Sequence, residues 1–314
     1  MQKSVAIVGA GVSGLTCGVV FAERGFRTSI LAEQIGTQTT SGAAAALWFP
    51  YDAEPAEKVI PWALATYQVL VDLAKDSESG VSMIELRQYC RTGKIQIPDW
   101  TQPYVISSEV GGPLTISVFE SGFAVRVPLM DTTIYLDYLA NRFQNAGGAI
   151  QGKVRLEKLD DVDLKFDLVI NCAGVGAREL ARDVDLEPHR GQVAIVPKID
   201  KLNSAIVCDD APLMYAIPRK NDCVFGGTNE VSDNLAPDPA TTNAIVTECS
   251  RVLKIDKPRV LRERVGLRPF RKSGVRLERE KLSDGRTVIH NYGHGGSGFT
   301  LSWGCAGDVF ELIG

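Results

Sequence analysis

The sequence predicts an α/β fold in which a Rossmann-like domain is interleaved with a smaller domain built on an antiparallel sheet. The chain opens with an apolar strand, a glycine-rich turn and a helix, and it closes with the same order of elements after residue 288. Between these ends, short apolar segments are separated by Gly and Pro, which is typical of β-rich insertions. We expect residues 1–48, 130–188 and 275–314 to form the first domain. Residues 49–129 and 189–274 are expected to form the second.

The opening unit has the pattern of a dinucleotide-binding turn. We expect a strand at 4–8, a helix at 13–24 and a second strand at 28–31. Gly9, Gly11 and Gly14 give the spacing G-x-G-x-x-G, and Glu33 follows about 20 residues later, where a ribose-binding acid is expected. Such glycines let the backbone approach a pyrophosphate at a helix N-terminus. The alternatives are a purely structural βαβ unit and a Glu33 that is only a surface acid.

The remaining elements follow from periodicity and turn residues. Helical spacing predicts helices over 62–75, 132–145 and 241–253. Apolar runs predict strands over 83–88, 114–119, 123–127, 167–171, 192–196, 213–218, 223–227 and 259–267. The strand at 167–171 ends in another glycine turn, so we expect it to return to the first sheet. The last four strands are expected to form the antiparallel sheet, and the interface between the domains is the natural place for a substrate.

The closing unit, residues 288–304, contains a strand, the loop Gly-His-Gly-Gly-Ser-Gly and a helix that begins near Phe299. Glycine-rich loops before helices, one at each end of the chain, suit a long ligand that is held at two places. We therefore predict FAD, with its pyrophosphate at the first loop and its isoalloxazine ring at the second.

Composition and charge indicate which classes of binding partner and which cellular compartment to expect. The 314 residues carry a net charge of −4, so we expect no nucleic-acid or membrane partner. Seven cysteines without a C-x-x-C pair suggest a reducing environment. We see no cleavable signal, no apolar run of membrane-spanning length and no peroxisomal tripeptide, and we expect a cytoplasmic protein.

No metal site is expected, because His290 and His294 lie on a strand and a glycine loop and not on one helix face. We interpret His290 as a hydrogen-bonded structural residue near the flavin. Arg264, Arg271, Arg276 and Arg279 are interpreted as ion-paired residues on sheet faces.

Several motifs in the same order resemble the D-amino-acid oxidase family of FAD flavoproteins, which also contains D-aspartate oxidase. They are residues 288–304 around His290, Val-Gly-Leu-Arg-Pro at 265–269, Arg-Leu-Glu-Arg-Glu at 276–280, Asn-Cys-Ala-Gly at 171–174, Arg-Gly-Gln at 190–192 and Ala-Ala-Ala-Leu-Trp at 44–48. The resemblance covers residues 4 to about 307. It implies an FAD domain of glutathione-reductase type and a smaller substrate domain.

The resemblance also implies roles for particular residues. Cofactor contacts are implied for Gly9, Gly11, Val12, Ser13, Gly14, Glu33, Thr40, Ser41, Ala45, Val154, Gly295, Gly296, Gly298, Phe299 and Thr300. Arg268 and Tyr215 would bind the substrate carboxylate, and the carbonyl of Gly296 would accept from the amine. No residue in this set suits a general base, which agrees with hydride transfer from Cα to flavin N5.

The expected substrate pocket comprises Leu47, Phe49, Tyr51, Val207 and Ile217. The segment 209–212 is short and lacks the tyrosine that the family often carries on a lid, and Phe49 replaces a glutamine found in some members. We therefore expect oxidation of neutral, apolar D-amino acids by O₂ to 2-oxo acid, ammonia and H₂O₂. The alternatives are a glycine or secondary-amine oxidase, an amino-acid dehydrogenase and a flavin-binding redox sensor. A homodimer is left open.

Overall fold

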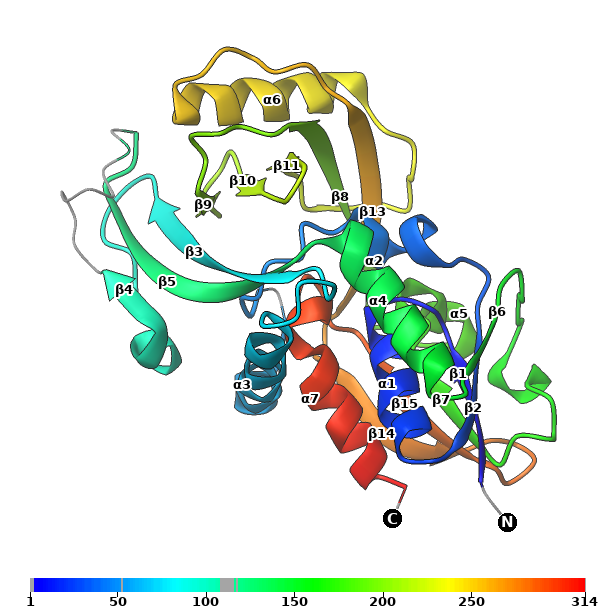
Figure 1. The fold of residues 1–314 in the computed structure, drawn as a ribbon. Coiled ribbons are helices and arrows are strands. Elements are labelled where there is room, and N and C mark those ends of the chain that lie inside the picture. Colours follow the sequence, from blue (N-terminus) through cyan, green and yellow to red (C-terminus); the bar gives the residue numbers. More distant parts are fainter. Residues whose placement is uncertain (1–2, 52, 108–115, 117, 314) are drawn as a thin grey trace.

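The computed structural model describes residues 3–51, 53–107, 116 and 118–313, and they form two lobes around two sheets (Figure 1). The predicted α/β fold class is confirmed. The first sheet has the strand order β14 (Arg276–Lys281), β15 (Thr287–Tyr292), β7 (Leu168–Asn171), β1 (Ser4–Val8), β2 (Arg27–Leu31) and β6 (Ala149–Gln151). Its neighbouring strands are parallel except β14 and β15. All five residues of β1 are buried, as expected for the centre of a parallel sheet.

Helices pack beside this sheet because each has an apolar face. They are α1 (Val12–Glu23), α4 (Thr132–Asn145) and α7 (Gly298–Glu311), and α3 (Ala56–Leu73) packs against α7. The Asp131 carboxylate caps α4 by accepting from the N–H of Thr133. Gly304 lets α7 approach α3 closely, because a Cβ there would lie 2.3 Å from the carbonyl oxygen of Trp62.

The second sheet is continuous across the other lobe. Its order is β12 (Glu230–Val231), β8 (Leu186–Pro197), β11 (Asp222–Gly226), β10 (Met214–Pro218), β9 (Ser204–Cys208), β3 (Val81–Cys90), β5 (Ser121–Met130) and β4 (Val105–Ser107), with β13 (Arg262–Arg271) also paired to β8. Helix α6 (Pro239–Leu253) covers part of one face and closes a separate apolar core (Figure 1). The sheet is antiparallel as predicted, apart from β3 and β9, which are parallel. A long stretch of chain joins these two strands, so no hairpin imposes an antiparallel arrangement.

Short elements complete the fold. They are η1 (Gly36–Gln38), α2 (Thr40–Ala43), η2 (Asp99–Tyr104), η3 (Leu159–Asp161), η4 (Gly174–Gly176) and α5 (Ala177–Leu180). The first sheet draws its strands from residues 4–31, 149–171 and 276–292, and the second from residues 81–130 and 186–271. The domain borders themselves stay a prediction.

Two local expectations are corrected. Helix α3 begins at Ala56 and not at residue 62, because it accommodates Pro61 in its second turn, where Val59 is already buried. Of the strand expected at 114–119, residues 114, 115 and 117 lie outside the described residues. Ile116 and Phe119 are not in a strand: the N–H of Phe119 donates to the carbonyl of Ile116 in a turn.

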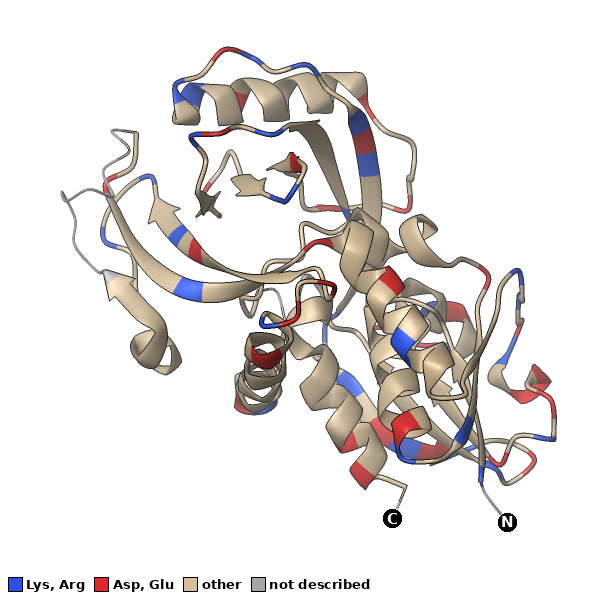
Figure 2. Ribbon diagram, in the orientation of Figure 1, with Lys and Arg blue, Asp and Glu red and all other residues tan. Residues whose placement is uncertain are grey.

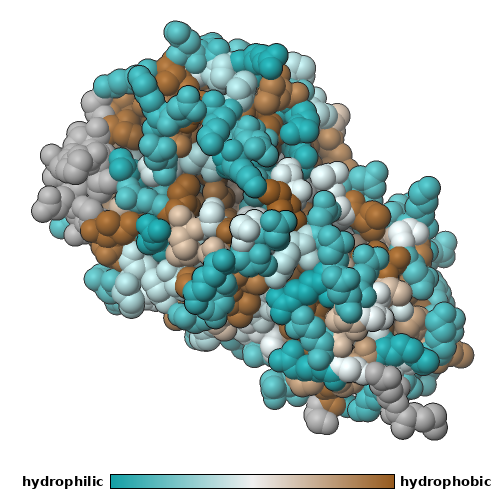
Figure 3. Space-filling model, in the orientation of Figure 1, coloured by the Kyte–Doolittle hydropathy of each residue, from teal (hydrophilic) through white to brown (hydrophobic). Residues whose placement is uncertain are grey.

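Basic and acidic residues are interspersed along the chain in both lobes (Figure 2). The face shown in Figure 3 is largely hydrophilic, with hydrophobic residues in separate groups. Within the described part of the chain, no helix has both the length and the apolar character that a membrane span requires.

Candidate active site

A cavity of about 550 Å³ lies between the two sheets. It reaches from the carboxyl ends of β1, β2 and β7 to one face of the second sheet. Ligands of open parallel sheets bind at such strand ends. On the cofactor side the cavity is lined by Gly9, Gly11, Val12, Ser13, Glu33, Thr40, Ser41, Ala45, Val154, Gly295, Gly296, Gly298 and Phe299. On the substrate side it is lined by Leu47, Phe49, Tyr51, Val207, Tyr215, Ile217 and Arg268.

Two of the predicted site residues, Gly14 and Thr300, do not line the cavity. Gly14 lies where a Cβ would come within 1.9 Å of the Gly9 carbonyl oxygen, so it permits α1 to pack tightly against the turn. Gly9 has φ +107°, and a Cβ there would lie 2.4 Å from the Cys172 carbonyl oxygen. Gly14 therefore requires glycine for packing, and Gly9 requires it for both packing and backbone conformation.

The N-termini of α1 and α7 both face this cavity. Ser297 precedes α7 without capping it, and at α1 the first N–H, that of Val12, donates to Ser41 Oγ at 3.0 Å. Val12, Ser13, Gly298 and Phe299, the first residues of the two helices, line the cavity. Helix N-termini carry orphan N–H donors and partial positive charge, so both ends suit electron-rich groups of one ligand.

The hydroxyl groups of Ser297 and Thr300 bind the main chain of the segment 49–51 instead. Ser297 Oγ accepts from the N–H of Tyr51 at 2.6 Å and donates to its carbonyl at 2.5 Å. Thr300 Oγ1 makes the same pair of bonds to Phe49, at 3.2 and 3.1 Å. The first turn of α7 therefore fixes the chain that carries Phe49 and Tyr51 into the cavity. Sequence reasoning did not find this role of Ser297, since nothing local links it to a segment so far away.

The far end of the cofactor side contains an exposed ion pair. Arg155 Nη1 lies 3.8 Å from Glu33 Oε1, and both residues line the cavity. The N–H of Val154 is already bonded to the carbonyl of Ala32. Arg155 is a cavity residue that the sequence analysis did not name.

Arg268 and Tyr215 lie together on the substrate side. Arg268 Nη1 donates to the carbonyl of Thr228 at 2.9 Å and lies 3.4 Å from Asn229 Oδ1. Burial raises the pKa of the Tyr215 hydroxyl, and the Arg268 guanidinium opposes this rise. The phenol therefore stays protonated at neutral pH and can donate a hydrogen bond.

Three glycines provide the room for these two side chains. A Cβ at Gly191 would lie 2.5 Å from Arg268 Nη2, and a Cβ at Gly226 would lie 2.0 Å from the Tyr215 ring. A Cβ at Gly227 would lie 2.8 Å from the Tyr215 hydroxyl. None of these three was among the predicted site residues.

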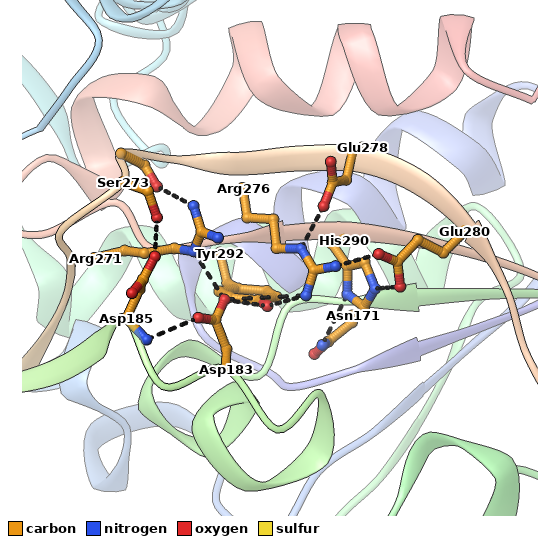
Figure 4. Close-up of polar contacts among 11 residues, drawn as sticks. Asn171, Asp183, Asp185, Arg271, Ser273, Arg276, Glu278, Glu280, His290 and Tyr292 are labelled. Atoms are coloured by element: carbon orange, nitrogen blue, oxygen red, sulfur yellow. Dashed lines mark hydrogen bonds and ion pairs between the residues drawn. The ribbon is translucent and has the colours of Figure 1, made fainter.

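His290 does not line the cavity but belongs to a partly buried polar network that includes residues of β7, β14 and β15 (Figure 4). Its Nε2 lies 3.1 Å from Glu280 Oε2, and its Nδ1 lies 3.2 Å from the amide nitrogen of Asn171. The predicted hydrogen bonding of His290 is thus confirmed, and its proximity to the flavin stays a prediction. In the same network the Asp183 carboxylate pairs with Arg271 at 2.8 Å and accepts from the Tyr292 hydroxyl, as Figure 4 shows.

His294, in contrast, lines the cavity and is almost fully buried. Its Nε2 lies 3.0 Å from Asn291 Oδ1, and burial lowers its pKa to about 4. The imidazole is therefore neutral at physiological pH. Among the residues described, no group of three or more His, Cys, Asp or Glu side chains could hold a metal ion.

The fold and the site define a flavoprotein oxidoreductase. A glycine turn that a Cβ would fill and one cavity that two helix N-termini face fit a dinucleotide cofactor. A family model described as FAD dependent oxidoreductase matches residues 4–312. The chain belongs to this family, and its cofactor is FAD.

Individual proteins of similar sequence or structure give a more specific comparison. The chain is 39% identical over 312 residues to a D-amino-acid oxidase of Rubrobacter xylanophilus, covering 98% of this chain and 95% of that protein. It is 38% identical over 316 residues to a D-amino-acid oxidase of Streptomyces coelicolor, covering 98% and 96%. The solved structure of glycine oxidase from Geobacillus kaustophilus superposes with a TM-score of 0.82 at 16% identity, covering 99% and 95%, which shows a shared fold.

Proposed function

We propose that this chain is a D-amino-acid oxidase that converts a D-amino acid, O₂ and water to a 2-oxo acid, ammonia and H₂O₂. The observation that carries the proposal is that Arg268 and Tyr215 share one cavity with the glycine turns of the cofactor site. The names of the relatives from Rubrobacter and Streptomyces support the same activity.

The residues on the substrate side would bind and orient the amino acid. The Arg268 guanidinium is planar and permanently charged, so it can hold a carboxylate through two parallel hydrogen bonds. The Tyr215 phenol would donate to the same carboxylate, and the Gly296 carbonyl would accept from the amine. Bound FAD supplies the hydride acceptor at N5. The chain itself would contribute by holding the Cα–H of the amino acid close to that atom. Such positioning can by itself accelerate the hydride transfer strongly.

The walls around this position are apolar: Leu47, Phe49, Val207 and Ile217 line the cavity. They favour neutral, apolar substrates over D-aspartate. Burying a polar group without a hydrogen bond costs about 2–7 kcal/mol, and burying the unpaired side-chain carboxylate of D-aspartate against such walls costs more. A cytoplasmic location and a homodimer belong to the same proposal, and fractionation and light scattering test them.

The test is peroxide formation by the purified, FAD-loaded protein with D-amino acids, L-amino acids, glycine and sarcosine. We expect oxidation of apolar D-amino acids, with flavin absorbance that bleaches without oxygen and returns in air. Exclusive turnover of glycine and sarcosine would replace the proposal with a secondary-amine oxidase. Bleaching that air does not reverse would indicate a dehydrogenase. A flavin that no amino acid bleaches would leave only a flavin-binding protein.

A further inference from the structure

Three neighbouring strands carry cavity-lining side chains in one row across the second sheet. Gln88 of β3 is paired with Val207 of β9, and Val207 is paired with Tyr215 of β10. All three residues line the cavity. Adjacent strands lie about 4.8 Å apart, so Gln88 lies roughly 10 Å across the sheet from the strand of Tyr215. The row therefore runs along the cavity wall from Tyr215 to Gln88.

An acidic residue lies at this far end. Asp209 follows Val207 by two residues, at the end of β9, and its side chain lines the cavity. Its Oδ2 accepts a hydrogen bond from Gln88 Nε2 at 2.7 Å. Gln88 is only 7% exposed, so this amide holds the carboxylate in place from within the sheet.

The Asp209 carboxylate has no cationic partner among the residues that the structure describes. No Lys or Arg forms an ion pair with it within the described ranges of the chain. The residue is exposed and lies where the cavity opens, although neighbouring protein displaces part of the water around its carboxylate. This partial desolvation raises the pKa of its carboxyl, the Gln88 hydrogen bond opposes the rise, and the neighbouring Asp210 adds to it. A cation arriving through the cavity would compensate the charge.

The adjacent Asp210 is in a different situation. Its Oδ2 accepts from the N–H of Arg91 at 2.6 Å, and it does not line the cavity. Of these two consecutive aspartates, only Asp209 can therefore meet a ligand. Asp210 provides a matched control of equal charge at almost the same position.

We propose that Asp209, held by Gln88, recognises a cationic group at the end of the substrate side chain, so that the enzyme takes long basic D-amino acids such as D-lysine and D-arginine. The inference rests on the proposed oxidase function, and it replaces the preference for neutral side chains, which the apolar walls alone suggest, with a preference for apolar stems that end in a cation. The apolar wall at Val207 and Leu86 packs against the methylene stem, and the carboxylate pairs with the charged end. Negative charge at this end also disfavours D-glutamate.

The experiment compares D-lysine with D-norleucine, which has the same stem without the ammonium group. Steady-state kcat/KM for both substrates is measured with the FAD-loaded protein and with Asp209→Asn and Asp210→Asn. We expect the native protein to prefer D-lysine. Asp209→Asn keeps the shape and should lower kcat/KM for D-lysine roughly 10- to 100-fold, the range for losing a charge-assisted hydrogen bond, and leave D-norleucine within about twofold. Asp210→Asn should leave the ratio of the two unchanged.

The outcomes separate this inference from the proposed function. If D-norleucine is oxidised but Asp209→Asn leaves the D-lysine to D-norleucine ratio unchanged, the role of Asp209 is wrong and the oxidase function stands. The role of Asp209 is also wrong, and the oxidase function again stands, if Asp210→Asn changes the D-lysine to D-norleucine ratio as much as Asp209→Asn does. If neither substrate nor any other D-amino acid reduces the flavin, the proposed function fails first. Flavin content and D-norleucine turnover show whether each variant is folded.

Discussion

Gly191 lies directly against the guanidinium group of Arg268. The two residues come from the paired strands β8 and β13, and a Cβ at position 191 would approach Nη1, Nη2 and Cζ to within 2.7 Å. The backbone at Gly191 is outside the left-handed region, so the glycine is needed for space and not for conformation. The absence of one methyl group therefore sets the position of the proposed carboxylate-binding group.

Gly191→Ala should impair substrate binding without unfolding the protein. The end of an arginine side chain moves easily, so the methyl group would displace the guanidinium and not the backbone. We expect kcat/KM for D-amino acids to fall roughly 10- to 100-fold, because small misplacements of orienting groups have effects of this size. Kinetics, flavin content and Tm would be measured together. Unchanged kinetics would mean that Arg268 does not hold the carboxylate in the observed position.

Arg268→Ala should reduce activity more severely while FAD stays bound. Removing one partner of a buried charge pair costs about 2–5 kcal/mol, or roughly 30-fold to several-thousand-fold in kcat/KM. Arg268→Lys should recover only part of this, since an ammonium group cannot make the two parallel bonds. Arg262→Ala is the matched control, because Arg262 lies on the same strand but outside the cavity lining. Equal losses in the Arg268 and Arg262 variants would refute the assignment.

Gly9→Ala should lose FAD. The residue has φ +107°, and a Cβ there would collide with the Cys172 carbonyl, so the turn must open. Gly147→Ala carries a similar conformational cost at φ +89°, but nothing lies within 4 Å of its Cβ. Each should destabilise the protein by about 1–3 kcal/mol, and only Gly9→Ala should show a lower flavin-to-protein absorbance ratio. Full flavin content in Gly9→Ala would contradict the predicted role of this turn.

His294 should make the stability of the protein fall between pH 6.5 and pH 4. Burial lowers its folded-state pKa to about 4, whereas an unfolded histidine has a pKa of about 6.5. The unfolded state therefore binds the proton more readily, and the free energy of unfolding decreases as the pH drops through this window, by up to about 3 kcal/mol. Denaturant unfolding of the native protein and of His294→Gln at pH 7.5, 6 and 5 checks this. The stability difference between the two proteins should shrink with falling pH; parallel pH profiles would show that His294 does not titrate in this way.

Much of the fold follows from local patterns in the sequence. The run Ser4–Val8 is apolar enough to be a central parallel strand, and Gly9, Gly11 and Gly14 have the spacing that a pyrophosphate turn needs. The start of α3 at Ala56 was missed because tertiary burial outweighs the penalty of Pro61. The parallel pairing of β3 with β9 was missed because it depends on a connection of more than a hundred residues, which no local pattern encodes.

The sequence by itself determined the α/β class, the FAD cofactor and the set of chemical groups in the site, because glycine spacing and strand periodicity are short-range steric properties. Only the tertiary structure decided which groups meet. It directs the hydroxyls of Ser297 and Thr300 to the main chain of residues 49–51, and it turns Asp209 into the cavity while Asp210 binds Arg91. These contacts join segments far apart in the chain, so they depend on how the two sheets pack and not on any neighbouring residue.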